Sequence, residues 1–147
     1  MIFNAKMLTN AAVIAAVSLT SLTAAAADCK DVALADGQVA IHYNRPDGNY
    51  EDWGIHIWKS PNIGLTNWFI PKMPTGCDSF GMYWTLPLGK FGETKIVNYI
   101  IHKGDVKEQG GTDMNFDANK TKEIWVNAGS PVNHMSKDDA VKAQSAK

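Results

Sequence analysis

The segment from His42 to Trp58 constrains the fold of this chain more than any other. It reads HYNRPDGNYEDWGIHIW. Pro46 and Gly48 are typical of a turn, because proline fixes its own φ and glycine accepts a positive φ. The pattern therefore predicts a strand over residues 39–43, a turn, and a second strand over residues 53–58.

The second of these strands has two unlike faces, because successive side chains of a strand point to opposite sides. Ile55 and Ile57 share one face with Trp53, and this face suits a buried core. His56 and Trp58 share the other face, with about 7 Å between them along the strand. An imidazole and an indole on a rigid strand form a flat, amphipathic surface on which a sugar ring can stack. His56 and Trp58 are therefore candidate binding residues.

Short apolar segments separated by turn residues continue along the chain, and we expect strands over 66–70, 80–86, 95–102, 114–116 and 122–127. The segment 95–102 is apolar on both faces and is predicted to be a central strand. Segments 72–79 and 103–113 are predicted to be loops. About six short strands without a convincing helix indicate a β-sandwich, and the missing crossover helices exclude a parallel βαβ order.

The remaining tryptophans that have apolar partners in their predicted strands are expected to fill the core. They are Trp53, Trp84 and Trp125. Tryptophan is on average a strongly buried residue, and five of them in a small domain are sufficient to fill much of it.

The first 27 residues are typical of a secretory signal peptide, with Lys6, an apolar run and a final stretch of alanines up to Ala27. Cleavage after Ala27 would leave a domain over residues 28–129 and a polar tail over 130–147. We expect that tail to be weakly helical or flexible. Export to the periplasm or out of the cell follows from this interpretation. A retained membrane anchor is the alternative, although the apolar run is shorter than the ~20 residues of a bilayer span.

Cys29 and Cys77 are the two cysteines of the chain. An even number of cysteines in an exported protein favours a disulfide between them. Two alternatives remain open at this point. Both thiols could be free, or Cys29 could carry a lipid, although Asp28 stands before it where lipoprotein signals have a small residue.

The charge is nearly balanced, with 14 Lys and Arg against 15 Asp and Glu. The chain therefore lacks the basic field that nucleic acid or anionic lipid would need, and we expect no nucleic acid partner and, after signal cleavage, no membrane partner. The histidines and cysteines lack the spacing of a zinc site, and no nucleotide-binding loop or hydrolase elbow is present. We expect neither a metal nor a cofactor, and a neutral ligand fits this balance.

The segment over 42–58, followed by CDSFGMYW over 77–84 and IIHKGD over 100–105, closely resembles the pullulanase-associated domain, which is carbohydrate-binding module family 41. The similarity covers roughly residues 38–128. It implies an all-β, immunoglobulin-like antiparallel β-sandwich that binds α-glucans such as pullulan, starch, glycogen or maltooligosaccharides.

The resemblance also implies polar contacts from the loop that follows IIHKGD. Position-by-position matching gives Lys107 and Asp113 as the residues that hydrogen-bond sugar hydroxyls. An ammonium donates and a carboxylate accepts, which suits neighbouring hydroxyls. The loop is one residue longer than is usual in the family, so Lys103 or Asp105 could contribute instead.

We therefore expect a non-catalytic module in which His56 and Trp58 receive successive glucose rings. The family normally occurs joined to a pullulanase, so a separate glycoside hydrolase is a candidate partner. The chain would then be a free-standing capture protein or a truncated product of a larger gene. The main alternative is a protein-interaction module that docks the same aromatic face onto an envelope protein. A small hydrolase with an unrecognised site is a third interpretation.

Overall fold

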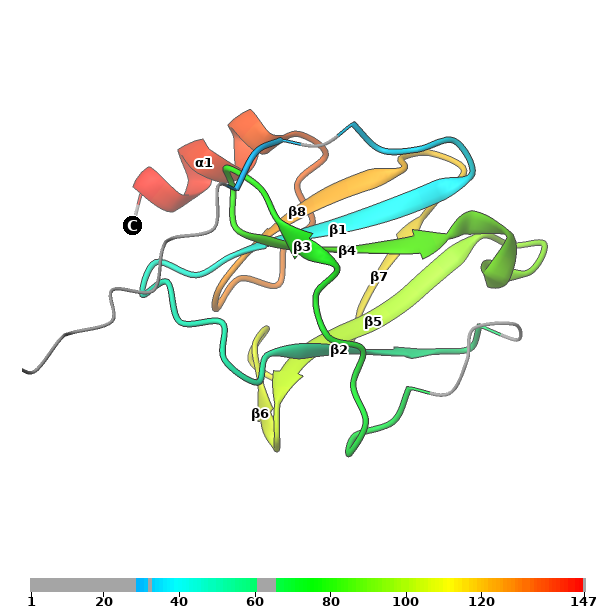
Figure 1. Cartoon of the computed structure of the whole chain (residues 1–147), viewed down its shortest axis with the longest axis horizontal. Helices are drawn as coiled ribbons and strands as arrows, with labels where there is room; N and C mark the ends of the chain where they lie inside the picture. Colours follow the sequence, from blue (N-terminus) through cyan, green and yellow to red (C-terminus); the bar gives the residue numbers. More distant parts are fainter. Residues whose placement is uncertain (1–28, 32, 61–65, 147) are drawn as a thin grey trace, which may run out of the picture.

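The computed structural model describes residues 29–31, 33–60 and 66–146. The expected signal peptide lies outside these residues. Within these residues, eight strands, one 3-10 turn and one helix follow one another (Figure 1). They are β1 (Gln38–Asn44), β2 (Gly54–Trp58), β3 (Gly76–Cys77), β4 (Met82–Pro87), η1 (Leu88–Phe91), β5 (Ile96–Lys103), β6 (Val106–Lys107), β7 (Met114–Asp117), β8 (Glu123–Asn127) and α1 (Lys137–Ser145).

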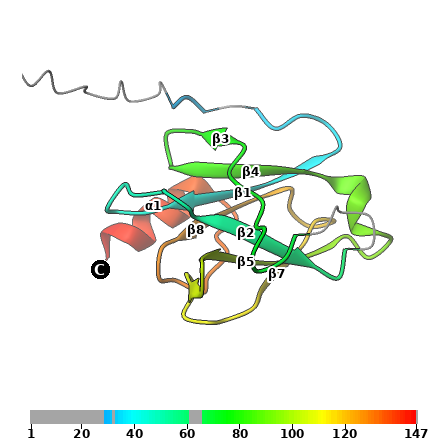
Figure 2. The same cartoon turned by 60° about the horizontal axis from the view of Figure 1, so that its bottom comes forward.

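The strands form two sheets that face each other (Figures 1 and 2). Sheet A has the order β3-β4-β1-β8, and sheet B has the order β2-β5-β6, with β7 also pairing with β5. All pairs are antiparallel except β1 with β8, which is parallel. The predicted all-β, immunoglobulin-like sandwich is confirmed, with one parallel pair and one short helix added to it.

The core lies between the two sheets, and alternate residues of β1, β2, β4, β5, β7 and β8 fill it. On β2, Ile55 and Ile57 are buried, whereas His56 and Trp58 are only half-buried. The predicted alternation of this strand is therefore confirmed. The expectation that residues 95–102 form a central strand is also confirmed, because β5 pairs with β2 on one side and with β6 and β7 on the other.

Three segments differ from the sequence predictions. The predicted loops over 72–79 and 103–113 contain the two-residue strands β3 and β6, which are too short to show any periodicity. The expected strand over 66–70 is instead a tight turn. Its cause is Asn67, whose Oδ1 accepts hydrogen bonds from the backbone N–H groups of Phe69 at 2.8 Å and Ile70 at 2.9 Å.

Two of the three tryptophans expected in the core are there. Trp53 and Trp84 are buried, and the Trp84 indole donates to the backbone oxygen of Lys72. Trp125 was predicted wrongly, because it lies half-buried on the outer face of sheet A and stacks on His42. Its strand neighbours Ile124 and Val126 occupy the inward positions of β8.

The segment after Ser130 is more ordered than the sequence suggested, since it ends in helix α1. Ser136 caps this helix by accepting a hydrogen bond from the backbone N–H of Asp139. Ala140 is fully buried, and its backbone oxygen accepts a hydrogen bond from the Asn127 side chain of β8. In the described part of the chain, no helix combines the length and the apolar character needed to cross a membrane.

A disulfide joins Cys29 to Cys77 across 48 residues. It ties the segment that precedes β1 to β3, at the edge of sheet A. The lead-in segment, residues 29–31 and 33–37, lies on the outer side of sheet A, where Ala33, Leu34 and Ala35 face β1.

Candidate functional site

The outer face of sheet B carries the residues that strand alternation singled out. His56 and Trp58 stack with their ring centroids 5.6 Å apart and their planes inclined by 23°. In the register with β5, His56 lies opposite Ile100 and Trp58 opposite Asn98. Directly paired residues of an antiparallel sheet point to the same side, so these four side chains share one face.

A third ring, Trp68, joins this face and was missed by the sequence reasoning. It projects from the turn at Asn67 and stacks on His102, with the centroids 4.0 Å apart and the planes 9° apart. It also meets His56 edge-on, with a centroid distance of 6.4 Å. Because Trp68 sits in a turn, no strand alternation could have indicated its direction. We call His56, Trp58 and Trp68 the aromatic shelf.

Two polar contacts fix Trp68 in this position. Its indole Nε1–H donates a hydrogen bond of 2.8 Å to Oδ1 of Asp105. The ammonium of Lys107 lies over its ring, 5.4 Å from the centroid, which is within the range of a cation–π contact. Lys107 pairs with His102 between β6 and β5, so strand register places it on the same face as the shelf.

The four residues predicted to bind ligand are therefore only partly brought together. His56, Trp58 and Lys107 lie on one face. Asp113 is exposed just before β7, and no hydrogen bond or ion pair among the described residues connects it to the shelf. Asp105, the alternative acidic residue, reaches the shelf through the indole of Trp68.

Lys103, the alternative basic residue, has a different partner. Its ammonium is 3.5 Å from Oδ2 of Asp52 in the turn that precedes β2. The pair is exposed, so its contribution to stability is small. Lys107, and not Lys103, is therefore the cation that lies against the shelf.

The neighbours of His56 define its protonation state. Thr66 Oγ1 donates its single hydrogen to the backbone oxygen of Ile57, so at 3.1 Å it accepts a hydrogen bond from His56 Nδ1–H. Burial lowers the pKa of His56, and the nearby imidazole of His102 lowers it further. The ring is thus neutral at neutral pH, with the Nε2 lone pair left to accept a hydrogen bond.

This lowered pKa predicts a dependence of stability on pH. Above the ordinary histidine pKa of about 6.5, His56 is neutral in both folded and unfolded chains and has no effect. As the pH falls below that value, the unfolded state binds the proton first, and the free energy of unfolding decreases. We expect His56→Gln to lose less stability than the wild type between about pH 7.5 and pH 5.5 in urea titrations. Equal losses in the two proteins would contradict this assignment.

The site is an open surface of rings with one cation and one carboxylate at its edge. Within residues 29–31, 33–60 and 66–146, no group of three or more His, Cys, Asp or Glu side chains is arranged to hold a metal ion. Most enzymes that hydrolyse a glycosidic bond use two carboxyl groups that flank the bond. The shelf carries Asp105 at its edge, and that carboxylate is engaged by Trp68.

The fold and the site together define the class of this chain, which is a small immunoglobulin-like β-sandwich with an aromatic outer face. Residues 37–135 match the family described as the bacterial pullanase-associated domain, and the chain belongs to this family. The resemblance to carbohydrate-binding module family 41 is thereby confirmed.

Individual relatives agree with this assignment. An alpha-amylase from Streptomyces lividans is 35% identical over 71 residues, which are 48% of this chain and 7% of that protein. PulA from Klebsiella oxytoca has a TM-score of 0.66 and 23% identity, with 84% of this chain and 13% of that chain covered. Family 41 carbohydrate-binding modules from streptococcal virulence factors, in a structure that concerns α-glucan recognition, have a TM-score of 0.61 and 20% identity. That match covers 72% of this chain and 50% of the other.

The chain spans only a small part of its longest relatives. At these identities the solved structures show that the fold is shared, and the roles of single residues have to be argued from this chain.

Proposed function

We propose that this chain is a non-catalytic module that binds α-glucans through the aromatic shelf. The observation that carries the proposal is the cluster of half-buried rings formed by His56, Trp58 and Trp68 on the outer face of sheet B. Membership of the pullulanase-associated family supports it, as does the structural likeness to family 41 carbohydrate-binding modules whose structure concerns α-glucan recognition.

The chemistry of the shelf suits a chain of glucose rings. The flat, apolar C–H faces of the sugar would lie on Trp58 and His56, which bury apolar surface without requiring a deep pocket. The hydroxyls at the edges of each ring would meet polar groups. The ammonium of Lys107 would donate, and Nε2 of His56 would accept, because its other nitrogen is engaged by Thr66. Affinity should be modest, since the sugar hydroxyls lose water that these few groups replace.

The role of Asp113 is part of the proposal and depends on the loop after β6. Gly110 and Gly111 both have positive φ, so this loop has a backbone that few other residues would adopt. We propose that Asp113 reaches a sugar ring bound beyond Lys107, whereas Asp105 acts by positioning Trp68. Asp113→Asn and Asp105→Asn separate these two roles. Asp113→Asn should weaken glucan binding and leave the tryptophan fluorescence of the free protein unchanged. Asp105→Asn should weaken binding and also change that fluorescence.

Loss of the Lys107 ammonium should reduce affinity by about tenfold, which is typical of a hydrogen bond to a charged group. Lys107→Met keeps most of the apolar length of the side chain and removes the charge. Isothermal titration with maltotetraose would measure the effect. Lys122 directly precedes β8, on the other sheet from the shelf. Lys122→Met is therefore a matched control and should bind maltotetraose like the wild type. Equal affinity of Lys107→Met and the wild type would exclude Lys107 from the site.

Affinity electrophoresis in gels that contain pullulan or glycogen tests the function as a whole. The wild-type protein should be retarded relative to a gel without polysaccharide. A folded protein that migrates equally in both gels would contradict glucan binding. Release of reducing sugar by the purified protein would contradict the non-catalytic part of the proposal.

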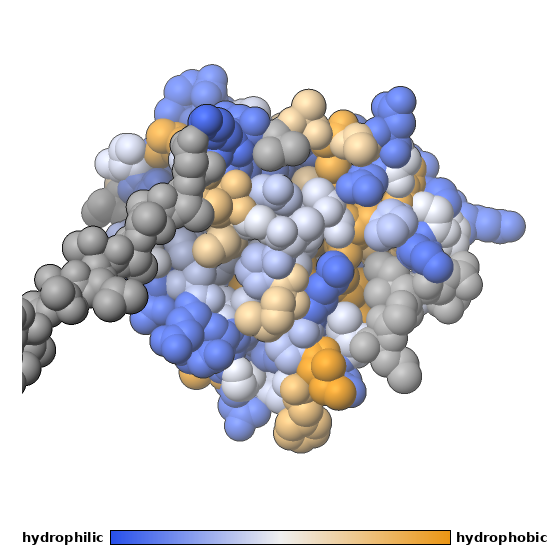
Figure 3. Space-filling model, in the orientation of Figure 1, coloured by the Kyte–Doolittle hydropathy of each residue, from blue (hydrophilic) through white to orange (hydrophobic). Residues whose placement is uncertain are grey.

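Docking to a protein is the second candidate, and a specific observation favours it. Three large apolar side chains are exposed on the segment between β2 and β3, namely Phe69 (92% exposed), Ile70 (66%) and Met73 (49%). In Figure 3 apolar surface protrudes at the lower edge of the molecule, where this segment lies in Figure 1. A separate glycoside hydrolase is the partner that the pullulanase context suggests. Phe69→Ser should abolish such docking and leave retardation by glycogen unchanged.

We also propose that the protein acts outside the cytoplasm, as a periplasmic or secreted module. The disulfide between Cys29 and Cys77 supports this location, because such bonds persist in oxidising compartments. Fractionation of cells that express the full chain, with detection of a protein shortened by the leader, would test it. Recovery of the unshortened protein from the cytoplasm would contradict it.

A further inference from the structure

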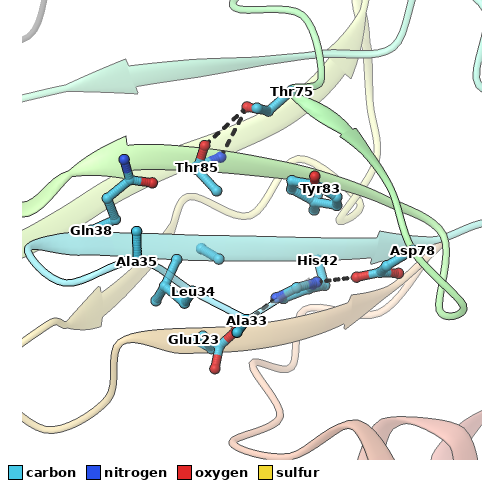
Figure 4. Close-up of a pocket in the computed structure, with 11 residues that line it drawn as sticks. Ala33, Leu34, Ala35, Gln38, His42, Thr75, Asp78, Tyr83, Thr85 and Glu123 are labelled. Carbon is cyan, nitrogen blue, oxygen red and sulfur yellow. Dashed lines mark hydrogen bonds and ion pairs between the residues drawn. The ribbon is translucent and has the colours of Figure 1, made fainter. Parts of the chain in front are cut away.

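A hollow of about 210 Å³ lies on the outer face of sheet A (Figure 4), whereas the aromatic shelf lies on the outer face of sheet B. Strands β1, β4 and β8 form its floor, and the lead-in segment forms a wall. Apolar atoms come from Leu34 and Ala40, and polar groups come from His42, Tyr83 and Glu123. A second hollow of about 170 Å³ shares His42 and Glu123 with it.

The imidazole at the junction of these hollows is held rigidly. His42 is 6% exposed, and its Nδ1 is 2.5 Å from Oδ2 of Asp78. The ring also stacks on Trp125, with the centroids 4.8 Å apart and the planes 7° apart. Two contacts from different directions therefore fix both the position and the plane of this ring.

Asp78 is itself fixed as an acceptor. Its Oδ1 accepts hydrogen bonds from the backbone N–H groups of Phe80 at 2.8 Å and Gly81 at 2.9 Å. Burial alone would raise the pKa of Asp78, but the hydrogen bonds from His42 and from these two N–H groups outweigh it and lower the pKa. An ionised Asp78 receives Nδ1–H of His42, which leaves Nε2 directed toward Glu123, at 3.4 Å.

Further polar groups line the hollow without being engaged by the protein. Among the described residues, no hydrogen bond involves the Tyr83 hydroxyl or the side-chain amide of Gln38. Figure 4 shows both side chains at the hollow, together with His42 and Glu123. Ligand sites are mostly apolar cavities with a few convergent polar groups, and this hollow has that character at a size suited to a single small ring.

We propose that this hollow binds a single pyranose ring, as a second sugar site that takes the end of an α-glucan chain. The inference rests on the proposed function for its choice of ligand. A pyranose combines apolar C–H faces with a rim of hydroxyls, and the hollow combines Leu34 and Ala40 with the groups of His42, Tyr83 and Glu123. The lead-in segment closes one side, so the hollow admits a ring end-on, whereas the shelf is open for a chain lying flat.

Each polar residue has a definite role in this site. The carboxylate of Glu123, whose side chain is 34% exposed, accepts from two neighbouring hydroxyls of the sugar. Nε2 of His42 forms a hydrogen bond with the next hydroxyl of the sugar. Asp78 maintains the orientation of the His42 ring through Nδ1. The Tyr83 hydroxyl donates from the β4 side. His42 and Asp78 are partly structural, so Glu123 and Tyr83 are the better residues for a test.

Nuclear magnetic resonance of the tryptophan indole N–H groups distinguishes the two sites. Trp125 stacks directly on His42 and reports the hollow, whereas Trp58 and Trp68 report the shelf. Titration of the full protein with methyl α-D-glucopyranoside should shift the Trp125 signal in a saturable manner. Titration with maltotetraose should shift all three signals.

Two conservative variants test whether the hollow is the site of the Trp125 response. Glu123→Gln and Tyr83→Phe should each weaken the Trp125 response by about tenfold and leave the Trp58 and Trp68 curves unchanged. Glu93→Gln, an exposed carboxylate in the loop before β5, should behave like the wild type. Two different variants are used so that the failure of one to fold leaves the test intact.

The outcomes separate this inference from the proposed function. If maltotetraose shifts the indole signals of Trp58 and Trp68, and neither sugar shifts that of Trp125, the second site is overturned and the shelf is supported. If maltotetraose shifts the Trp125 signal and leaves those of Trp58 and Trp68 unchanged, the hollow is supported and the shelf is overturned. A Trp125 response that both Glu123→Gln and Tyr83→Phe leave at wild-type strength overturns the proposed site, because the sugar is then bound elsewhere.

Discussion

Replacement of Trp58 with alanine is expected to reduce the affinity for maltooligosaccharides by about 30-fold, equivalent to about 2 kcal/mol. The indole lies on the outer face of β2, stacks on His56, and offers the largest flat apolar surface of that strand. The variant should remain folded, because Trp58 is half-buried and lies outside the apolar cluster that fills the sandwich. Isothermal titration with maltotetraose, together with electrophoresis in glycogen gels, would measure the loss.

Trp58→Phe is the matched control, because it keeps an aromatic face of smaller area at the same position. Its affinity should lie between those of the wild type and the alanine variant. Thermal unfolding of both variants should resemble that of the wild type. If Trp58→Ala binds maltotetraose as tightly as the wild type while remaining folded, the shelf is not the glucan site.

Removal of the disulfide is expected to lower the free energy of unfolding by about 4 kcal/mol. The bond closes a loop of 48 residues, and the chain-entropy model gives about this value for a loop of that length, with measured losses often smaller. The double variant Cys29→Ser with Cys77→Ser avoids leaving one free thiol. Guanidinium unfolding of this variant and of the wild type would give the difference.

The same experiment contains two controls. A reductant should lower the free energy of unfolding of the wild-type protein to the value of the double variant. Glucan retardation should persist in the double variant, because the bridge lies at the edge of sheet A and the shelf lies on sheet B. Equal stability of the oxidised wild type and the double variant would contradict the stabilisation that loop closure is expected to give.

The strands of the sandwich that have one buried face and one outer face could be predicted from the sequence, because their residues alternate in polarity. Alternation placed Ile55 and Ile57 inside and Trp58 outside, and the two-sided apolar character of 95–102 identified the central strand β5. The same rule, applied to β8, would have placed Trp125 outside, because Ile124 and Val126 have the opposite parity. Apolar neighbours along a strand therefore do not by themselves indicate that a residue is buried.

Other features have no local signature. Strands β3 and β6 have two residues each, and their pairing depends on contacts with β4 and β5. Helix α1 has a readable cap at Ser136, but its position depends on the burial of Ala140 against β8. At the site, alternation found His56 and Trp58 and could not find Trp68, which projects from a turn. The family resemblance supplied Lys107, and register with His102 places it beside the rings.

The lead-in segment and helix α1 meet on the sheet A side of the molecule, where Asp31 and Lys137 are 2.8 Å apart. Both ends of the described chain therefore leave the sandwich from the side opposite the aromatic rings (Figure 1). A partner joined directly to either end of the described residues, whether an affinity tag, a sensor surface or a neighbouring domain, would meet the sandwich on its sheet A side and leave the rings of sheet B facing the solution. The path of the backbone would thus determine how an immobilised protein is oriented. A polysaccharide could then reach the aromatic rings without a change at the point of attachment.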